Sequence, residues 1–271
     1  MSADGTEFVL ERKGCPLHYW MSGPEGRPLL VFTHGAAVDH RSFNPIIPPI
    51  GKEYRILNWD VRGQGLSQPV GEPFSIPLAV EDLLAILAKL GYQKAVLIGH
   101  SNGSYISQEL VYRYSECVQA MVIVDGTCIT WPRSPFDRWI LQASSPIMSL
   151  LPYETLKKAG LPYFSVRKDV QAYIYDVFSM IPTKQQFIAI WNGVVSCLHN
   201  EPGYRITQPV LLVHGDGDQT GDIKKIAPLW AAAMPNCRYE VIPNARHMAP
   251  MDNPEFFNHL VMEFLAKWAP V

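Results

Sequence analysis

The stretch KAVLIGHSNG, residues 94–103, decides the fold. Residues 94–98 predict a strand that is apolar on both faces from Ala95 onward, and residues 102–114 suit a helix. Between the two, residues 99–103 match the pattern G-x-S-x-G in the strand-turn-helix context that this pattern requires. Glycines two residues on either side of Ser101 leave room for a sharp, strained turn, which presents the serine hydroxyl at the carboxyl end of the strand. The alternative is a serine in an ordinary Gly-rich loop.

Strands and helices alternate on both sides of this turn. This alternation predicts right-handed crossovers and a doubly wound α/β fold, with helices on both faces of a mostly parallel eight-stranded sheet. The first two strands flank a turn at Lys13-Gly14 and form an antiparallel pair. The other predicted strands are 29–33, 55–59, 94–98, 119–124, 210–214 and 238–242, and the further helices are 78–90, 223–234 and 254–268.

The interval 128–205 breaks the alternation. It lacks the apolar runs of buried strands, is rich in aromatic residues, and is predicted to be a helical insertion packed over one edge of the sheet. We therefore expect a core domain made of residues 1–127 and 206–271, with the insertion between them. Six prolines divide the insertion into short helices: Pro132, Pro135, Pro146, Pro152, Pro162 and Pro182.

A serine hydroxyl is a poor nucleophile at neutral pH and needs a base that is itself held by an acid. His247 follows the last predicted strand and precedes the final helix, so we expect it at the carboxyl edge of the sheet as the general base. Asp218 lies just beyond the strand 210–214 and reaches the same edge as the acid. Asp125 ends another strand at this edge and is the alternative acid.

In this order of serine, acid and histidine, with spacings of 117 and 29 residues, the chain resembles the α/β-hydrolase superfamily over nearly its whole length. Four other motifs of that superfamily occur in the expected order: His34-Gly35-Ala36, the turn 60–67 (DVRGQGLS), Gly215-x-x-Asp218, and His247 before Asn253-Pro254-Glu255. The resemblance implies an oxyanion hole made by the backbone N–H groups of Ala36 and Asn102. The turn 60–67 is interpreted as structural.

The resemblance also implies that the insertion is a cap that roofs the active site. His40, His100, Trp131 and Trp191 are candidate substrate contacts, although each can equally be a structural histidine or part of the cap's own core. A triad of this kind opens esters, thioesters, lactones, amides and certain carbon–carbon bonds. We expect a serine hydrolase for a small, largely apolar ester or lactone, with carbon–carbon hydrolysis, a ligand receptor and a lyase as alternatives. The sharp turn 99–103 corresponds to the nucleophile elbow of this superfamily, and a serine at its centre argues against haloalkane dehalogenases and soluble epoxide hydrolases, whose relatives carry aspartate there.

Composition narrows the partners and the location. The net charge of −2 gives no field that would favour nucleic acid or an anionic membrane surface. The first twelve residues lack the apolar core of a secretory signal, and no run of eighteen apolar residues occurs, so a cytoplasmic protein without membrane insertion is expected. The sequence contains neither a metal-ligand motif nor a dinucleotide-binding glycine motif, so we expect no metal and no cofactor. It leaves the oligomeric state open.

Overall fold

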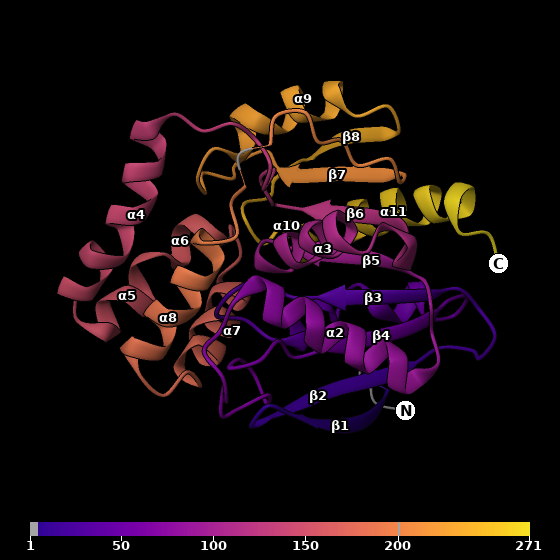
Figure 1. Cartoon of the computed structure of the whole chain (residues 1–271), viewed down its shortest axis with the longest axis horizontal. Helices are drawn as coiled ribbons and strands as arrows, with labels where there is room; N and C mark the ends of the chain where they lie inside the picture. Colours follow the sequence, from indigo (N-terminus) through magenta and orange to yellow (C-terminus); the bar gives the residue numbers. More distant parts are fainter. Residues whose placement is uncertain (1–4, 200) are drawn as a thin grey trace.

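Eight strands pair into one sheet in the computed structural model, which describes residues 5–199 and 201–271 (Figure 1). The strand order is β1-β2-β4-β3-β5-β6-β7-β8; the pairs β1/β2 and β2/β4 are antiparallel and the other pairs are parallel. The predicted fold class is confirmed. The strands are β1 (Thr6–Arg12), β2 (Cys15–Ser22), β3 (Leu29–Thr33), β4 (Arg55–Trp59), β5 (Ala95–His100), β6 (Val118–Val124), β7 (Val210–Gly215) and β8 (Cys237–Ile242).

The parallel register brings the carboxyl ends of the central strands to one edge of the sheet. Thr33 of β3 pairs with Gly99 of β5, and Val124 of β6 pairs both with His100 of β5 and with Val213 of β7. The loops that follow these four strands therefore start side by side. This edge is where an α/β sheet places its ligands.

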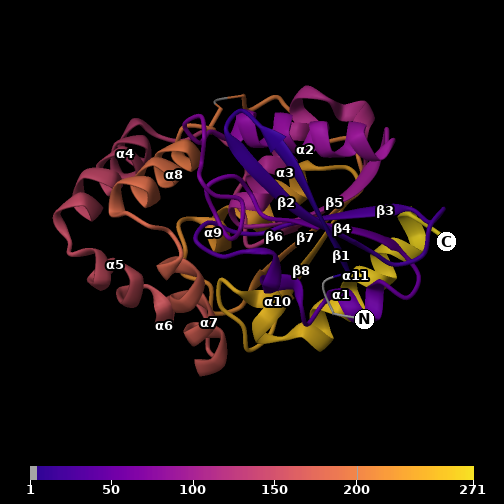
Figure 2. The same cartoon turned by 90° about the horizontal axis from the view of Figure 1, so that it is seen from below.

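Helices cover both faces of the sheet, as Figure 2 shows. One face packs against α2 (Ile76–Leu90), α3 (Asn102–Arg113) and α9 (Ile223–Ala233), and the other against α1 (Ile47–Ile50) and α11 (Pro254–Trp268). Successive residues of each central strand are buried in opposite layers: in β5, Leu97 joins the first layer and Ile98 the second. Burial on both faces explains why these strands read as continuous apolar runs.

Local sequence sets the ends of the helices that flank the sheet. Ser75 caps α2 by accepting a hydrogen bond from the N–H of Leu78, and Gly91 ends the helix with a positive φ of 78°. Asn253 caps α11, in which Pro254 occupies the first turn, where its missing N–H is not needed. The predicted start of this last helix is confirmed.

Among the described residues between β6 and β7 there are five helices, which gather at the left of Figure 1, at the carboxyl ends of the strands. Four of these helices start at or within two residues of one of the predicted prolines. Pro146, however, lies inside the first helix, which continues through it. None of the helices in the described parts of the chain has the length and apolar character needed to cross a bilayer. The five helices are α4 (Pro135–Leu150), α5 (Tyr153–Ala159), α6 (Leu161–Phe164), α7 (Lys168–Ser179) and α8 (Lys184–Val195).

Candidate active site

Ser101 occupies the sharp turn between β5 and α3. Its φ of 50° and ψ of −112° put a non-glycine residue in a sparsely populated, strained conformation. The two glycines of the motif are required by close approach: a Cβ on Gly103 would lie 1.9 Å from the carbonyl oxygen of Thr33, and one on Gly99 would lie 2.3 Å from that of Gly103. The turn therefore folds tightly against β3 and holds the serine at the carboxyl end of β5.

His247 and Asp218 meet Ser101 at this edge. The Nε2 of His247 lies 2.9 Å from the Oγ of Ser101, and its Nδ1 lies 3.0 Å from the Oδ2 of Asp218. Asp218 also accepts a hydrogen bond of 2.7 Å from the N–H of Thr220. The structure thus connects three residues from three separate loops in one hydrogen-bonded chain, which is the arrangement in which an imidazole can take a proton from a hydroxyl.

The hydrogen bonds and charges around Asp218 favour its ionised form. Burial by itself raises the pKa of a carboxyl group, but the hydrogen bond from His247, the charge of His247 and the hydrogen bonds from Thr220 outweigh it. The pKa of Asp218 is therefore held below its ordinary value. An ionised acid beside Nδ1 keeps the proton on that nitrogen and leaves Nε2 free to accept one from Ser101.

Asp125, the alternative acid, does not hold the bond to His247 and makes different contacts. Its Oδ1 accepts a hydrogen bond of 2.9 Å from the N–H of Gly215, and its Oδ2 accepts one of 3.2 Å from the N–H of Ala249. Burial and the neighbouring charge of Asp218 raise its pKa well above the ordinary value. Asp125 therefore joins the end of β7 to the start of α10 (Ala249–Asp252), whereas Asp218 holds the bond to the imidazole.

The two expected oxyanion donors lie beside Ser101. Asn102 is the first residue of α3, so its N–H is one of those that an α-helix leaves without an intrahelical partner. Ala36 lines the pocket above Ser101 in the loop after β3. The next N–H in that loop, on Ala37, is already taken by a 2.7 Å hydrogen bond to the Oε1 of Gln64.

A pocket of about 100 Å³ opens above Ser101 and His247. His100 and Trp191, two of the candidate substrate contacts, line it. The other apolar side chains of this pocket were not among the predicted substrate contacts. A cap roofing the site was expected, but the turns of helix that face Ser101 are set by long-range packing. These side chains are Val38 and Met248 from the sheet edge, Phe164 from α6, Ile174 and Phe178 from α7, and Phe187 from α8.

The structure does not bring His40 and Trp131 to this pocket. The Nδ1 of His40 lies 2.8 Å from the Oδ1 of buried Asp60, and its ring stacks on Trp20 with centroids 3.6 Å apart. Trp131 packs against the main apolar core. His40 was expected near Ser101 because it follows β3, but its bond to Asp60 beyond β4 holds it elsewhere, and this long-range contact leaves no local signal in the sequence. Trp131 was expected as an aromatic residue of the cap, but it packs against the core instead.

His100 supports the backbone of the histidine loop. Its Nε2 donates a hydrogen bond of 2.6 Å to the carbonyl oxygen of His247, and its side chain is only 2% exposed. Burial, reinforced by the charge of His247, lowers the pKa of His100 to about 3. The neutral ring keeps its proton on Nε2 and so holds His247 in place.

This lowered pKa predicts a loss of stability in acid. In the unfolded chain His100 binds a proton near its ordinary pKa of about 6.5, whereas in the folded chain it stays neutral down to pH 3, so stability falls as the pH falls between these values. From pH 6.5 to 4 this one group should remove about 3 kcal/mol from the free energy of unfolding. Urea unfolding of the wild type and His100→Gln across this range measures it; equal pH slopes in the two proteins would contradict the prediction.

Comparison with known proteins agrees with this architecture. A model of the "Alpha/beta hydrolase family" matches residues 30–260. The human protein named Epoxide hydrolase 4 is 24% identical over 286 aligned residues, which cover 94% of this chain and 77% of that protein. A thermophilic esterase from Thermogutta terrifontis superposes with a TM-score of 0.82 at 20% identity, covering 98% of this chain and 100% of the other. The enol-lactonase from Burkholderia xenovorans LB400 has a TM-score of 0.81 at 22% identity, covering 96% and 100%.

The structural neighbours share the fold, and the family match spans most of the chain, from β3 to α11. It includes the elbow, the loop of Asp218 and the loop of His247. The chain belongs to the alpha/beta hydrolase family.

Proposed function

We propose that the protein is a serine hydrolase that cleaves a carboxylic ester or lactone of a small, largely apolar substrate. The observation that carries this proposal is the hydrogen-bonded chain from Asp218 through His247 to Ser101, at the base of a pocket lined mainly by apolar side chains. Ser101 is the nucleophile, His247 the general base and Asp218 the acid that orients the histidine. The expectations that His100 and Trp191 contact the substrate, and that residues 128–205 form the cap, belong to the same proposal.

Each step of the reaction follows from this geometry. As the Oγ of Ser101 adds to the carbonyl carbon, the Nε2 of His247 takes its proton, and the N–H groups of Ala36 and Asn102 stabilise the oxyanion. Collapse of the tetrahedral intermediate expels the alcohol, which leaves with that proton. Water, deprotonated by His247, then attacks the acyl-enzyme and releases the carboxylic acid, restoring Ser101.

The identity of the nucleophile favours acyl transfer over epoxide opening. A serine that opened an epoxide would be left joined to the product by an ether bond, which water does not cleave under these conditions. An acyl-serine is an ester, and the same histidine that formed it can activate water to hydrolyse it. Ser101 therefore supports ester or lactone cleavage, although Epoxide hydrolase 4 is among the relatives.

Two measurements on the wild-type protein test the proposal. A fluorophosphonate should label the protein once per chain, and mass spectrometry should place the label on the peptide that contains Ser101. The protein should also hydrolyse p-nitrophenyl acetate and butyrate with saturation kinetics. Labelling without turnover of any ester or lactone would favour carbon–carbon hydrolysis, while the failure of both would favour a receptor or lyase; either result would overturn the proposal.

A further inference from the structure

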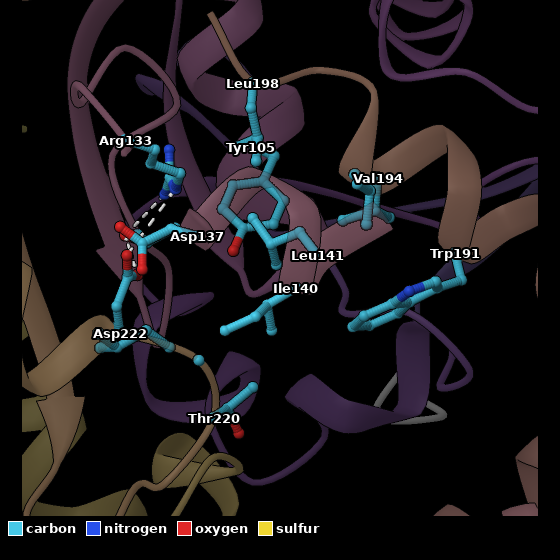
Figure 3. A pocket seen from close by; sticks show the side chains of 14 residues that line it. Tyr105, Arg133, Asp137, Ile140, Leu141, Trp191, Val194, Leu198, Thr220 and Asp222 are labelled. Atoms are coloured by element: carbon cyan, nitrogen blue, oxygen red, sulfur yellow. Dashed lines mark hydrogen bonds and ion pairs between the residues drawn. The ribbon is translucent and has the colours of Figure 1, made fainter. Parts of the chain in front are cut away.

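A second cavity of about 340 Å³ lies beside the catalytic pocket, between α4, α8 and the loops that follow β6 and β7 (Figure 3). We call it the side chamber. Its apolar lining includes Ile140, Leu141, Trp191, Val194, Leu198 and Ile223. Ile140 on α4 is also 48% exposed, so the side chamber reaches the protein surface at this helix.

The side chamber adjoins the catalytic pocket, because Trp191 and Thr220 line both. The indole Nε1 of Trp191 donates a hydrogen bond of 2.8 Å to the Oγ of Ser144, which fixes the ring between the two spaces. Thr220 is the residue whose N–H binds Asp218. A substituent that reached the side chamber from a carbonyl held at Ser101 would pass along Trp191 and Thr220, the two residues that the linings share.

The catalytic pocket and the side chamber differ in volume, and each volume fits a different part of a substrate. At about 30 Å³ for each water-sized group, 100 Å³ holds about three such groups and 340 Å³ about eleven. The catalytic pocket alone is smaller than the 300–1,000 Å³ that is usual for a small-molecule site, whereas the side chamber falls within that range. The catalytic pocket fits the reacting ester group, and the side chamber fits a larger substituent attached to it.

The polar end of the side chamber, opposite Trp191 in Figure 3, is already paired. The Nε of Arg133 lies 3.8 Å from the Oδ2 of Asp222, and its guanidinium also donates to the Oγ1 of Thr127 at 3.3 Å. Asp222 accepts a hydrogen bond of 2.8 Å from the same threonine. Arg133 is buried, and its charge is balanced by Asp222, so an anionic group entering here would compete with an existing carboxylate.

We propose that the side chamber is a binding site for the uncharged, apolar chain of the substrate, of up to about eleven non-hydrogen atoms. This inference depends on the proposed function only for the identity of the bond that is cleaved. The binding of the substrate's apolar chain does not depend on it. It predicts that a neutral chain is preferred over a chain of equal length that ends in a carboxylate, because the latter would bury a charge without a free partner.

Binding of 2-decanone, a neutral carbonyl compound that cannot be hydrolysed, tests the side chamber independently of catalysis. Isothermal titration should show binding to the wild type, and binding of 9-oxodecanoate should be at least tenfold weaker. Val195→Phe and Leu198→Trp add bulk to side chains of the lining, so each should weaken the binding of 2-decanone at least tenfold. Asn192→Phe adds bulk to the exposed side of the same helix and should have no effect.

Turnover gives the second measurement. In the wild-type enzyme, kcat/KM for p-nitrophenyl octanoate should exceed that for p-nitrophenyl acetate more than tenfold, or kcat/KM for octyl acetate should exceed that for ethyl acetate by the same factor. Val195→Phe should abolish this preference for the longer ester. If 2-decanone binds the wild type and both filled variants equally, or does not bind at all, the side-chamber inference is wrong. If 2-decanone binds as expected while no ester is cleaved and Ser101 is not labelled, the inference stands and the proposed function fails.

Discussion

Replacing Ser101 by alanine should lower kcat for p-nitrophenyl butyrate by about 10⁵- to 10⁶-fold, because the members of a serine triad act as a unit and the variant lacks the hydroxyl that attacks in the proposed reaction. The backbone should keep its shape: alanine tolerates the positive φ of this position as well as serine does, and the contacts around the turn are made by Gly99 and Gly103. Long time-course assays of purified protein measure the residual rate, with urea unfolding as the check on stability.

Ser107→Ala is the matched control. Ser107 lies in α3, is buried, and donates a 2.9 Å hydrogen bond to the carbonyl oxygen of Gly103, so the variant removes a buried hydroxyl two turns from the reaction. It should keep kcat within about threefold of wild type. A Ser101→Ala protein that is folded and retains more than a hundredth of the wild-type rate would show that another residue is the nucleophile.

Replacing Asp218 by asparagine should lower kcat by about 10⁴-fold, with little change in the fold. The amide has nearly the same shape as the carboxylate, but it cannot stabilise the imidazolium, and its NH₂ group favours the tautomer of His247 that carries the proton on Nε2. That tautomer has no lone pair for the proton of Ser101. The measurement is kcat for the same ester, compared at several pH values.

Asp125→Asn separates the two acids. The side chain of Asp125 accepts bonds from the N–H groups of Gly215 and Ala249, and an amide has only one oxygen to offer them, so we expect a loss of about 1–3 kcal/mol in the free energy of unfolding. Because the bond to His247 belongs to Asp218, kcat should fall by less than a hundredfold. Equal losses of kcat in the two folded variants would mean that Asp218 has been assigned wrongly.

The sheet could be predicted from the sequence because strands that are buried on both faces are apolar along most of their length. The predicted strands 29–33 and 55–59 coincide with β3 and β4, and the strand predicted at 94–98 corresponds to β5, which runs from Ala95 to His100. The loops at the carboxyl edge follow from this topology, since parallel strands must all end there. The sequence therefore predicted that the loops bearing Ser101, Asp218 and His247 lie near one another, and the structure adds the distances.

The pocket walls and the side chamber could not be predicted, because they depend on contacts between distant segments. Which faces of α7 and α8 turn toward Ser101 is decided by the packing of the helices α4 to α8 between β6 and β7. Pro146 was expected to end a helix, yet α4 continues through it, since one lost backbone hydrogen bond does not outweigh the other contacts of a sixteen-residue helix. His40 was placed by its loop position and Trp131 as an aromatic residue of the predicted cap, but His40 pairs with Asp60 and Trp131 packs against the core.

The elbow separates the shape of the site from its chemistry. Its conformation is imposed by the backbone of β5 and α3 and by the close contacts of Gly99 and Gly103, none of which involves the side chain at position 101. A different side chain at this position would therefore be aimed at the same point, next to the same histidine. In evolution, such a turn allows a lineage to exchange the reacting atom by changing one residue. The lineage can then acquire a new substrate through changes in the helices between β6 and β7, without rebuilding the sheet.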